Sequence, residues 1–261
     1  MTNGVPGRPD RSGRPTKAQR KEQARLEREE LQRKIAARSR NRRIGTVLVV
    51  LGAAVAVAAF TLLPSPDLAS AQDLLRQAAK AKEAAGCGDV TTTPPYDPAS
   101  QDRVHVDPNN GPPLSTYPTT PPASGPHAQI PPGPLGAGVY STLTLPELYR
   151  AIHSLEHGGT IVWYDPTAPS DEVAKLTAFY DRRVQDADVG QDRVIVAPYD
   201  FPEADGVLPE GTQMALVAWH RLQTCASVNL AVAFDFTSQY SFPTAEGRQY
   251  QGEAPEPGAA I

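Results

Sequence analysis

The sequence has few cysteines, methionines and tryptophans, and it lacks the motifs by which most catalytic and redox centres are recognised. Its 261 residues include only two cysteines, two methionines and two tryptophans, and no Cys-x-x-Cys pair is present. The wide cysteine spacing lacks the compact pattern of a thiolate zinc site. Glycine-rich phosphate loops, dinucleotide-binding fingerprints and nucleophile elbows are also missing, so the sequence shows no recognisable catalytic motif.

Charge is distributed very unevenly along the chain. Residues 1–43 hold 14 Lys/Arg against 5 Asp/Glu, whereas all later residues together hold 11 against 24. The two parts are separated by residues 44–63, a run of 20 residues without charge or proline. At about 1.5 Å per residue, a helix of this length matches a hydrocarbon core of about 30 Å. Arginines at its N-terminal end place that end in the cytoplasm.

We therefore predict a single-pass protein of the cell membrane. Residues 1–43 are a basic, partly helical cytoplasmic tail that contacts membrane lipid, residues 44–63 are the transmembrane helix, and everything later is extracytoplasmic. A cleaved signal peptide is the alternative, because residues 69–71 (Ala-Ser-Ala) have the small-x-small form of a cleavage site. A membrane protein complex is a further possible partner, and nucleic acid is not expected.

The extracytoplasmic part is predicted to be an α/β domain wrapped by a proline-rich segment. Residues 64–137 hold a short helix (73–85) and 15 of the 27 prolines, 13 of which lie between Pro94 and Pro134, and residues 242–261 are expected to be a disordered tail. Residues 138–241 alternate between strand and helix patterns, which implies a mixed sheet with packed helices in a thioredoxin-like element order. The expected elements are strands 138–143, 160–164, 193–197 and 213–221, and helices 144–157, 170–185 and 227–240.

The two cysteines, Cys87 and Cys225, both lie after the predicted span. An oxidising compartment and an even count favour a disulfide between them, with two free thiols or two thiolate metal ligands as alternatives. A bridge would join the start of the proline-rich segment to the far end of the last predicted strand.

All five histidines also follow the span, and four of them are candidate metal ligands. His153 and His157 share one face of the helix 144–157, a spacing that offers two nitrogens to one metal ion. Both lie off the apolar stripe of that helix, so they are not simple core residues. The proline-rich segment could deliver His105 and His127 to the same helix end, and histidine without thiolate suits zinc or copper. Alternatively, the histidines cap the helix and bond loop carbonyls.

Glu156 breaks two local rules at once. It falls near the apolar stripe and at the C-terminal end of a helix, where negative charge is disfavoured. Such a conflict often marks a functional site. The alternative is a frayed last turn in which Glu156 faces solvent.

Several motifs in this order resemble the bacterial domain-of-unknown-function family 3105. They are Cys87, residues 104–106 (VHV), residues 117–127 (YPTTPPASGPH), residues 153–159 (HSLEHGG) and the Trp219 to Cys225 ending. The resemblance covers about residues 85–240. It implies a membrane-tethered exported domain without an assigned activity and draws attention to His105, His127, Glu156 and His157.

Three functional hypotheses follow from the sequence. The first is an extracytoplasmic module without turnover, serving binding or envelope assembly. The second is a zinc- or copper-binding protein, either a metal chaperone or a metal-dependent hydrolase. The third is a purely structural partner of a membrane complex. Metal content separates the second hypothesis from the other two.

Overall fold

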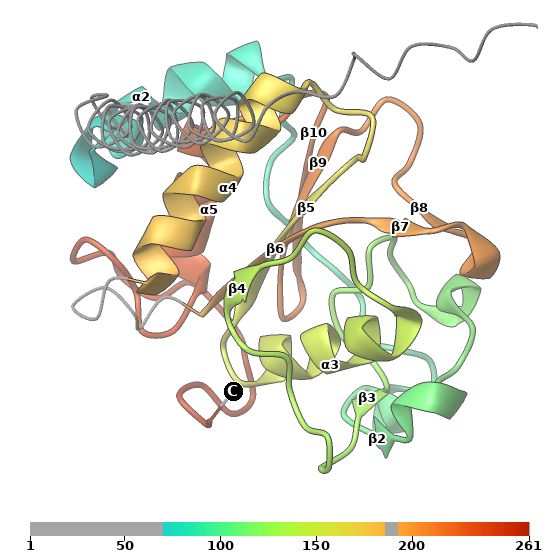
Figure 1. Cartoon of the computed structure of the whole chain (residues 1–261). Coiled ribbons are helices and arrows are strands. Elements are labelled where there is room, and N and C mark those ends of the chain that lie inside the picture. Colours follow the sequence, from blue (N-terminus) through green and yellow to red (C-terminus); the bar gives the residue numbers. More distant parts are fainter. Residues whose placement is uncertain (1–69, 186–192, 261) are drawn as a thin grey trace, which may run out of the picture. The chain divides into compact units, whose positions relative to one another are not determined.

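A six-stranded mixed sheet forms the centre of the folded part of the chain (Figure 1). The computed structural model describes residues 70–185 and 193–260. The helices are α2 (Ala71–Ala84), α3 (Leu145–Glu156), α4 (Ser170–Gln185) and α5 (Leu230–Tyr240). The strands are β1 (Thr91–Thr92), β2 (His105–Val106), β3 (His127–Ala128), β4 (Gly138–Val139), β5 (Thr160–Tyr164), β6 (Val194–Pro198), β7 (Asp200–Phe201), β8 (Gly206–Val207), β9 (Met214–Ala218) and β10 (Arg221–Cys225).

The strand order of the sheet is β1-β10-β9-β5-β6-β4. β5 pairs in parallel with β6 and antiparallel with β9, and β9 pairs antiparallel with β10. Every residue of β5, β6 and β9 is buried. Both faces of the sheet are therefore covered, which explains why these strands are continuous apolar runs rather than alternating patterns.

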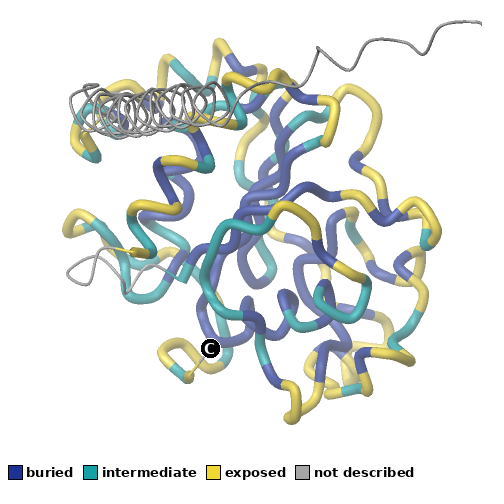
Figure 2. Tube along the Cα trace, viewed as in Figure 1, coloured by how far each residue is buried: buried dark blue, intermediate teal, exposed yellow. Residues whose placement is uncertain are grey.

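Two apolar cores lie on opposite faces of the sheet. On one face, Ile161 and Trp163 of β5 pack with α3 and with side chains of the proline-rich segment such as Tyr117. On the other face, Val162 and Tyr164 pack with helices α2, α4 and α5. The resulting arrangement has three layers, and Figure 2 shows the buried strands running through its middle.

The mixed α/β architecture predicted from the sequence is confirmed. The predicted capping box is formed at the start of α3, where the Thr144 backbone N–H donates to the Glu147 carboxylate at 2.8 Å. Cys87 and Cys225 are joined by a disulfide, which ties the end of α2 to β10. α3 covers one face of the sheet, and α4 and α5 cover the other. The thioredoxin-like description remains a prediction based on element order.

Two predicted strands are wrong in extent. The single strand expected over 213–221 is a hairpin of β9 and β10, because the chain reverses at Trp219–His220 with His220 in a left-handed conformation (φ 55°). The strand expected over 138–143 is only β4. Tyr140 still donates its backbone N–H to Val196, but the chain then turns into the capping box. The last helix starts at Leu230, not at 227, because Asn229 is its N-cap.

The tail expected to be disordered instead lies against the domain. Its backbone N–H groups at Phe242, Glu256 and Gly258 donate to Gly158, Glu156 and His157 respectively. These residues form no helix or strand, so composition alone gave no sign of their order.

Within residues 70–185 and 193–260 no helix is both long and apolar enough to cross a membrane. The predicted cytoplasmic tail and the predicted span at 44–63 lie outside the described residues.

Candidate metal centre

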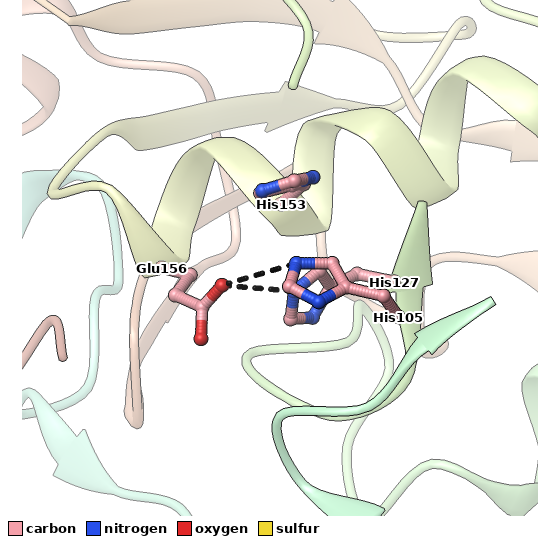
Figure 3. Close-up of side chains that lie close together, drawn as sticks. All are labelled: His105, His127, His153 and Glu156. Carbon is pink, nitrogen blue, oxygen red and sulfur yellow. Dashed lines mark hydrogen bonds and ion pairs between the residues drawn. The ribbon is translucent and has the colours of Figure 1, made fainter. Parts of the chain in front are cut away.

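Three histidines and one glutamate meet where the proline-rich segment crosses the C-terminal end of α3. They are His105, His127, His153 and Glu156, and each can offer one ligand atom such that all four atoms lie within 4.8 Å of one another. Figure 3 shows His105 and His127 together facing Glu156, with His153 beside them on α3.

His105 and His127 are brought together by a two-residue parallel ladder. β2 and β3 pair with His105 directly opposite His127, and their rings lie 4.7 Å apart between centroids. Residues opposite one another in a ladder point to the same face. The register therefore explains why two histidines 22 positions apart in the sequence present their rings side by side.

α3 supplies His153 and Glu156, three positions apart on one side of its last turn. Both are completely or almost completely buried, with His153 0% and Glu156 1% exposed. His153 and His157 lie off the apolar stripe of α3 but are buried nonetheless, because the proline-rich segment and the C-terminal tail cover that face of the helix. The frayed-turn interpretation of Glu156 is wrong, because its side chain does not face solvent.

The two ring nitrogens of His127 both face acceptors. Nδ1 lies 2.8 Å from the Gly125 carbonyl oxygen, which can only accept, so this nitrogen carries a proton and donates. Nε2 lies 3.0 Å from Oε2 of Glu156. A neutral ring would then turn a lone pair toward a carboxylate oxygen. A cation must therefore lie between the two atoms, either a second ring proton or a metal ion.

Glu156 remains ionised despite its burial. Burial by itself would raise its pKa, but hydrogen bonds from His127 and Arg103 and the charges of both groups outweigh that effect and lower the pKa to about 2. Arg103 Nε donates to Oε1 at 2.6 Å, which leaves Oε2 turned toward His127 and His105. The arginine thus orients the carboxylate so that one oxygen faces the histidines.

His153 is the least satisfied member of the cluster. Neither of its ring nitrogens has a hydrogen-bond partner of acceptable geometry within the described part of the chain. Burial, followed by the nearby His127 and His157, lowers its pKa to about 4, while a backbone contact with Ala128 acts weakly in the opposite direction. The ring is therefore neutral near pH 7 and keeps a free lone pair, as a metal ligand requires.

The spacing of the cluster fits a small divalent ion. In a tetrahedral zinc site with bonds of about 2.0–2.1 Å, neighbouring ligand atoms lie about 3.3 Å apart. Oε2 of Glu156 lies 3.0 Å from Nε2 of His127 and 3.7 Å from Nε2 of His105. The ring centroid of His153 is 4.8 Å from those of both other histidines. Three imidazoles and one carboxylate suit zinc or copper(II).

His157, the fourth predicted ligand, lies in an adjoining group rather than in this cluster. Its Nδ1 donates to the Ala260 carbonyl at 2.6 Å, and its Nε2 is 3.7 Å from Oε2 of Glu256. The alternative that the histidines cap the helix is therefore partly right for His157, because His157 is the C-cap residue of α3. Glu156 occupies the place in the cluster that was predicted for His157.

Two residues of the site were missed by the sequence analysis. Arg103 stands two positions before His105, a spacing that puts both side chains on one side of an extended segment. This spacing could have indicated that Arg103 lies near the site. Glu256 carried no signal, because it lies in a tail without periodicity. Arg103 joins the two carboxylates, with Nη2 donating to Glu256 at 2.7 Å.

The remaining histidine, His220, is used elsewhere. Its Nε2 is 2.8 Å from Oδ2 of Asp102, whose Oδ1 accepts from Ser124 Oγ at 2.7 Å. The Asp102 carboxylate thus links Ser124 to His220. The group fastens the proline-rich segment to the turn of the β9–β10 hairpin.

The comparisons with known proteins identify a family. A model described as "Protein of unknown function (DUF3105)" matches residues 113–259, which include His127, His153, Glu156 and Glu256 but not His105. No curated protein and no solved structure matches the chain. Because the match covers more than half of the sequence, the chain belongs to the DUF3105 family of proteins of unknown function.

Proposed function

We propose that this protein is a membrane-anchored extracytoplasmic metal-binding protein. Its folded domain binds one zinc or copper(II) ion through His105, His127, His153 and Glu156. The observation that carries the proposal is the 3.0 Å approach of His127 Nε2 to a Glu156 oxygen while Nδ1 is already a donor, since two acceptors in contact need a cation between them.

Burial and orientation of the ligands support a metal ion over a proton. A proton shared by His127 and Glu156 would satisfy those two residues only, and it would leave the buried nitrogens of His153 without partners. A metal ion satisfies all three histidines at once. On the side away from the cluster, His127 contacts the Gly125 carbonyl and Glu156 accepts a hydrogen bond from Arg103. Such contacts are typical of the second shell that orients metal ligands.

The test is the metal content of the full chain purified in detergent without a histidine tag. We expect about one zinc or copper ion per chain after loading and dialysis, and loss of that ion in His127→Ala and His153→Ala. His220→Ala is the matched control, because it removes a histidine from the same face of the sheet but outside the cluster, and it should keep the ion. A wild-type chain without bound metal would leave the cluster as a structural network and refute the proposal.

The membrane anchor and the compartment rest on the apolar run at 44–63 and on the charge asymmetry around it. The disulfide supports an oxidising compartment for the folded domain. In the proposed topology, membrane lipid is a partner of the basic N-terminal tail. Reporter fusions after residue 64 test the topology, and a reporter that is active only in the cytoplasm would overturn it.

A further inference from the structure

A second group of ligand-type side chains adjoins the proposed metal centre. Glu156, His157 and Glu256 can bring one ligand atom each within 4.8 Å of one another. His157 repeats the arrangement seen in His127, with Nδ1 held by a backbone carbonyl and Nε2 facing a carboxylate oxygen, here Oε2 of Glu256 at 3.7 Å. We call His157 and Glu256 the outer pair.

The outer pair connects the cluster with solvent on one side, and His105, whose side chain is 45% exposed, connects it with solvent on another. The side chain of Glu256 is 48% exposed, whereas that of His157 is 7% exposed and its ring lies 4.7 Å from that of His153. Glu156 belongs to both groups. A continuous series of ligand atoms therefore leads from an exposed carboxylate through a partly accessible imidazole to the buried histidines.

The charges at the site allow one ion at a time. Two carboxylates face the combined site, and the guanidinium of Arg103 already bridges them through Glu156 Oε1 and Glu256 Oε1. The two carboxylates and the guanidinium sum to one negative charge. This charge cannot balance the four positive charges of two divalent ions at neighbouring positions. The outer pair is thus not half of a two-metal centre.

We propose, building on the proposed function, that the outer pair is a transient cation-binding position that captures the ion and passes it to the inner cluster. The ion first exchanges waters for Glu256 and His157, then gains Glu156, and finally exchanges the outer pair for the inner histidines. Arg103 releases Glu256 while the ion occupies the outer pair and binds it again afterwards. The ion changes ligands without any change in oxidation state.

The test is the rate of zinc binding to the full-length apo protein in detergent, followed by tryptophan fluorescence after rapid mixing with Zn²⁺. Trp219 is a suitable reporter because its ring lies 5.8 Å from that of His127. We expect Glu256→Gln to slow association and dissociation by about tenfold each and to leave the equilibrium affinity almost unchanged, since Glu256 acts along the path and not at its end.

Two controls separate ligation from simple attraction of cations. Glu253→Gln removes a carboxylate of similar exposure from the same tail, where it pairs with Arg221, and it should bind zinc at the wild-type rate. The slow rate of Glu256→Gln should persist at high salt, because screening removes long-range attraction but not direct ligation. His157→Gln combined with Glu256→Gln should be no slower than the slower single variant, as expected for two ligands of one position.

Failure of this inference is distinguishable from failure of the proposed function. A wild-type chain that binds no stoichiometric metal refutes the proposed function and this inference with it. Normal stoichiometry and affinity with wild-type rates in Glu256→Gln refute the outer position alone. An effect of Glu256→Gln that disappears at high salt also refutes it, because only the electric field of the carboxylate would then be acting.

Discussion

Replacing His153 by leucine should stabilise the metal-free protein and abolish its response to metal. His153 is fully buried, and neither ring nitrogen has a hydrogen-bond partner within residues 70–185 and 193–260. A residue kept for stability alone would be apolar at such a position. Leucine has a similar volume and no polar atom, so the substitution removes the unpaired groups without leaving a large cavity.

The magnitude follows from two opposing effects. A buried polar group without a partner costs about 1–3 kcal/mol, and an imperfect fit of the new side chain costs up to about 1.5 kcal/mol. We therefore expect His153→Leu to raise the free energy of unfolding of the metal-free protein by about 1 kcal/mol, a rise in Tm of about 2–4 °C for a domain of this size. With zinc at a hundred times its Kd, the wild type should gain about 2.7 kcal/mol and the variant nothing.

The assay is thermal unfolding of the full chain in detergent with a chelator and with excess zinc. His127→Leu is the matched comparison, because both ring nitrogens of His127 have partners, and this change should lower metal-free stability as well as abolish the zinc response. The reasoning is refuted if His153→Leu is clearly less stable than the metal-free wild type, or if zinc still stabilises it.

Three further predictions concern the same fold. The metal-free protein should lose stability as the pH falls from 6.5 toward about 4, because the lowered pKa of His153 lets the unfolded chain bind a proton before the folded chain does. Denaturant midpoints at several pH values measure this loss. In His153→Leu the midpoint should depend less steeply on pH. Cys87 and Cys225 are 138 residues apart, and reducing the disulfide between them should lower the free energy of unfolding by about 4–5 kcal/mol. Reduction should also add the mass of two hydrogens, and an unchanged mass would contradict the bridge. Asp102→Asn weakens the charged contact with His220 and should cost about 1–3 kcal/mol in chemical unfolding without changing metal content. Burial raises the pKa of Asp102, but hydrogen bonds led by that from His220 lower it overall, so its contribution is present above the unfolded pKa of 3.8 and is lost as the pH falls through the lower folded pKa.

Local signals in the sequence predicted the elements whose ends are determined by local chemistry. The Thr144–Glu147 capping box and the apolar runs of β5 and β6 needed no knowledge of distant residues. The β9–β10 hairpin was missed because its turn depends on a left-handed histidine, His220, and not on glycine or asparagine. β10 (RLQTC) lacks a strict alternation of polar and apolar residues, so no strand pattern distinguished it from a polar loop.

The sequence pointed to His105, His127, His153 and Glu156, but it placed His157 among the ligands and did not reveal the environment of the site. Helical spacing brought out His153, and the rule broken by Glu156 identified that residue as unusual. The burial of His153 could not be predicted from α3 alone, since a helical wheel shows only where apolar residues of that helix lie, and His153 is off that stripe. The face of α3 that carries His153 is covered by segments that have no periodicity of their own. The path of these segments is determined by long-range contacts such as that of Asp102 with His220.

The position of the cluster gives the metal ion a structural consequence. The proline-rich layer on the α3 face has little regular pairing, because β2 and β3 contribute only two residue pairs. Besides a few backbone hydrogen bonds, its contacts with the rest of the domain depend on side chains, among them His105 and His127 from the layer and His153 and Glu156 from α3. An ion bound by all four joins the layer to the helix directly, and part of its binding free energy then becomes stability of the layer. In the proposed function, the same ligands therefore serve both metal binding and the ordering of this layer.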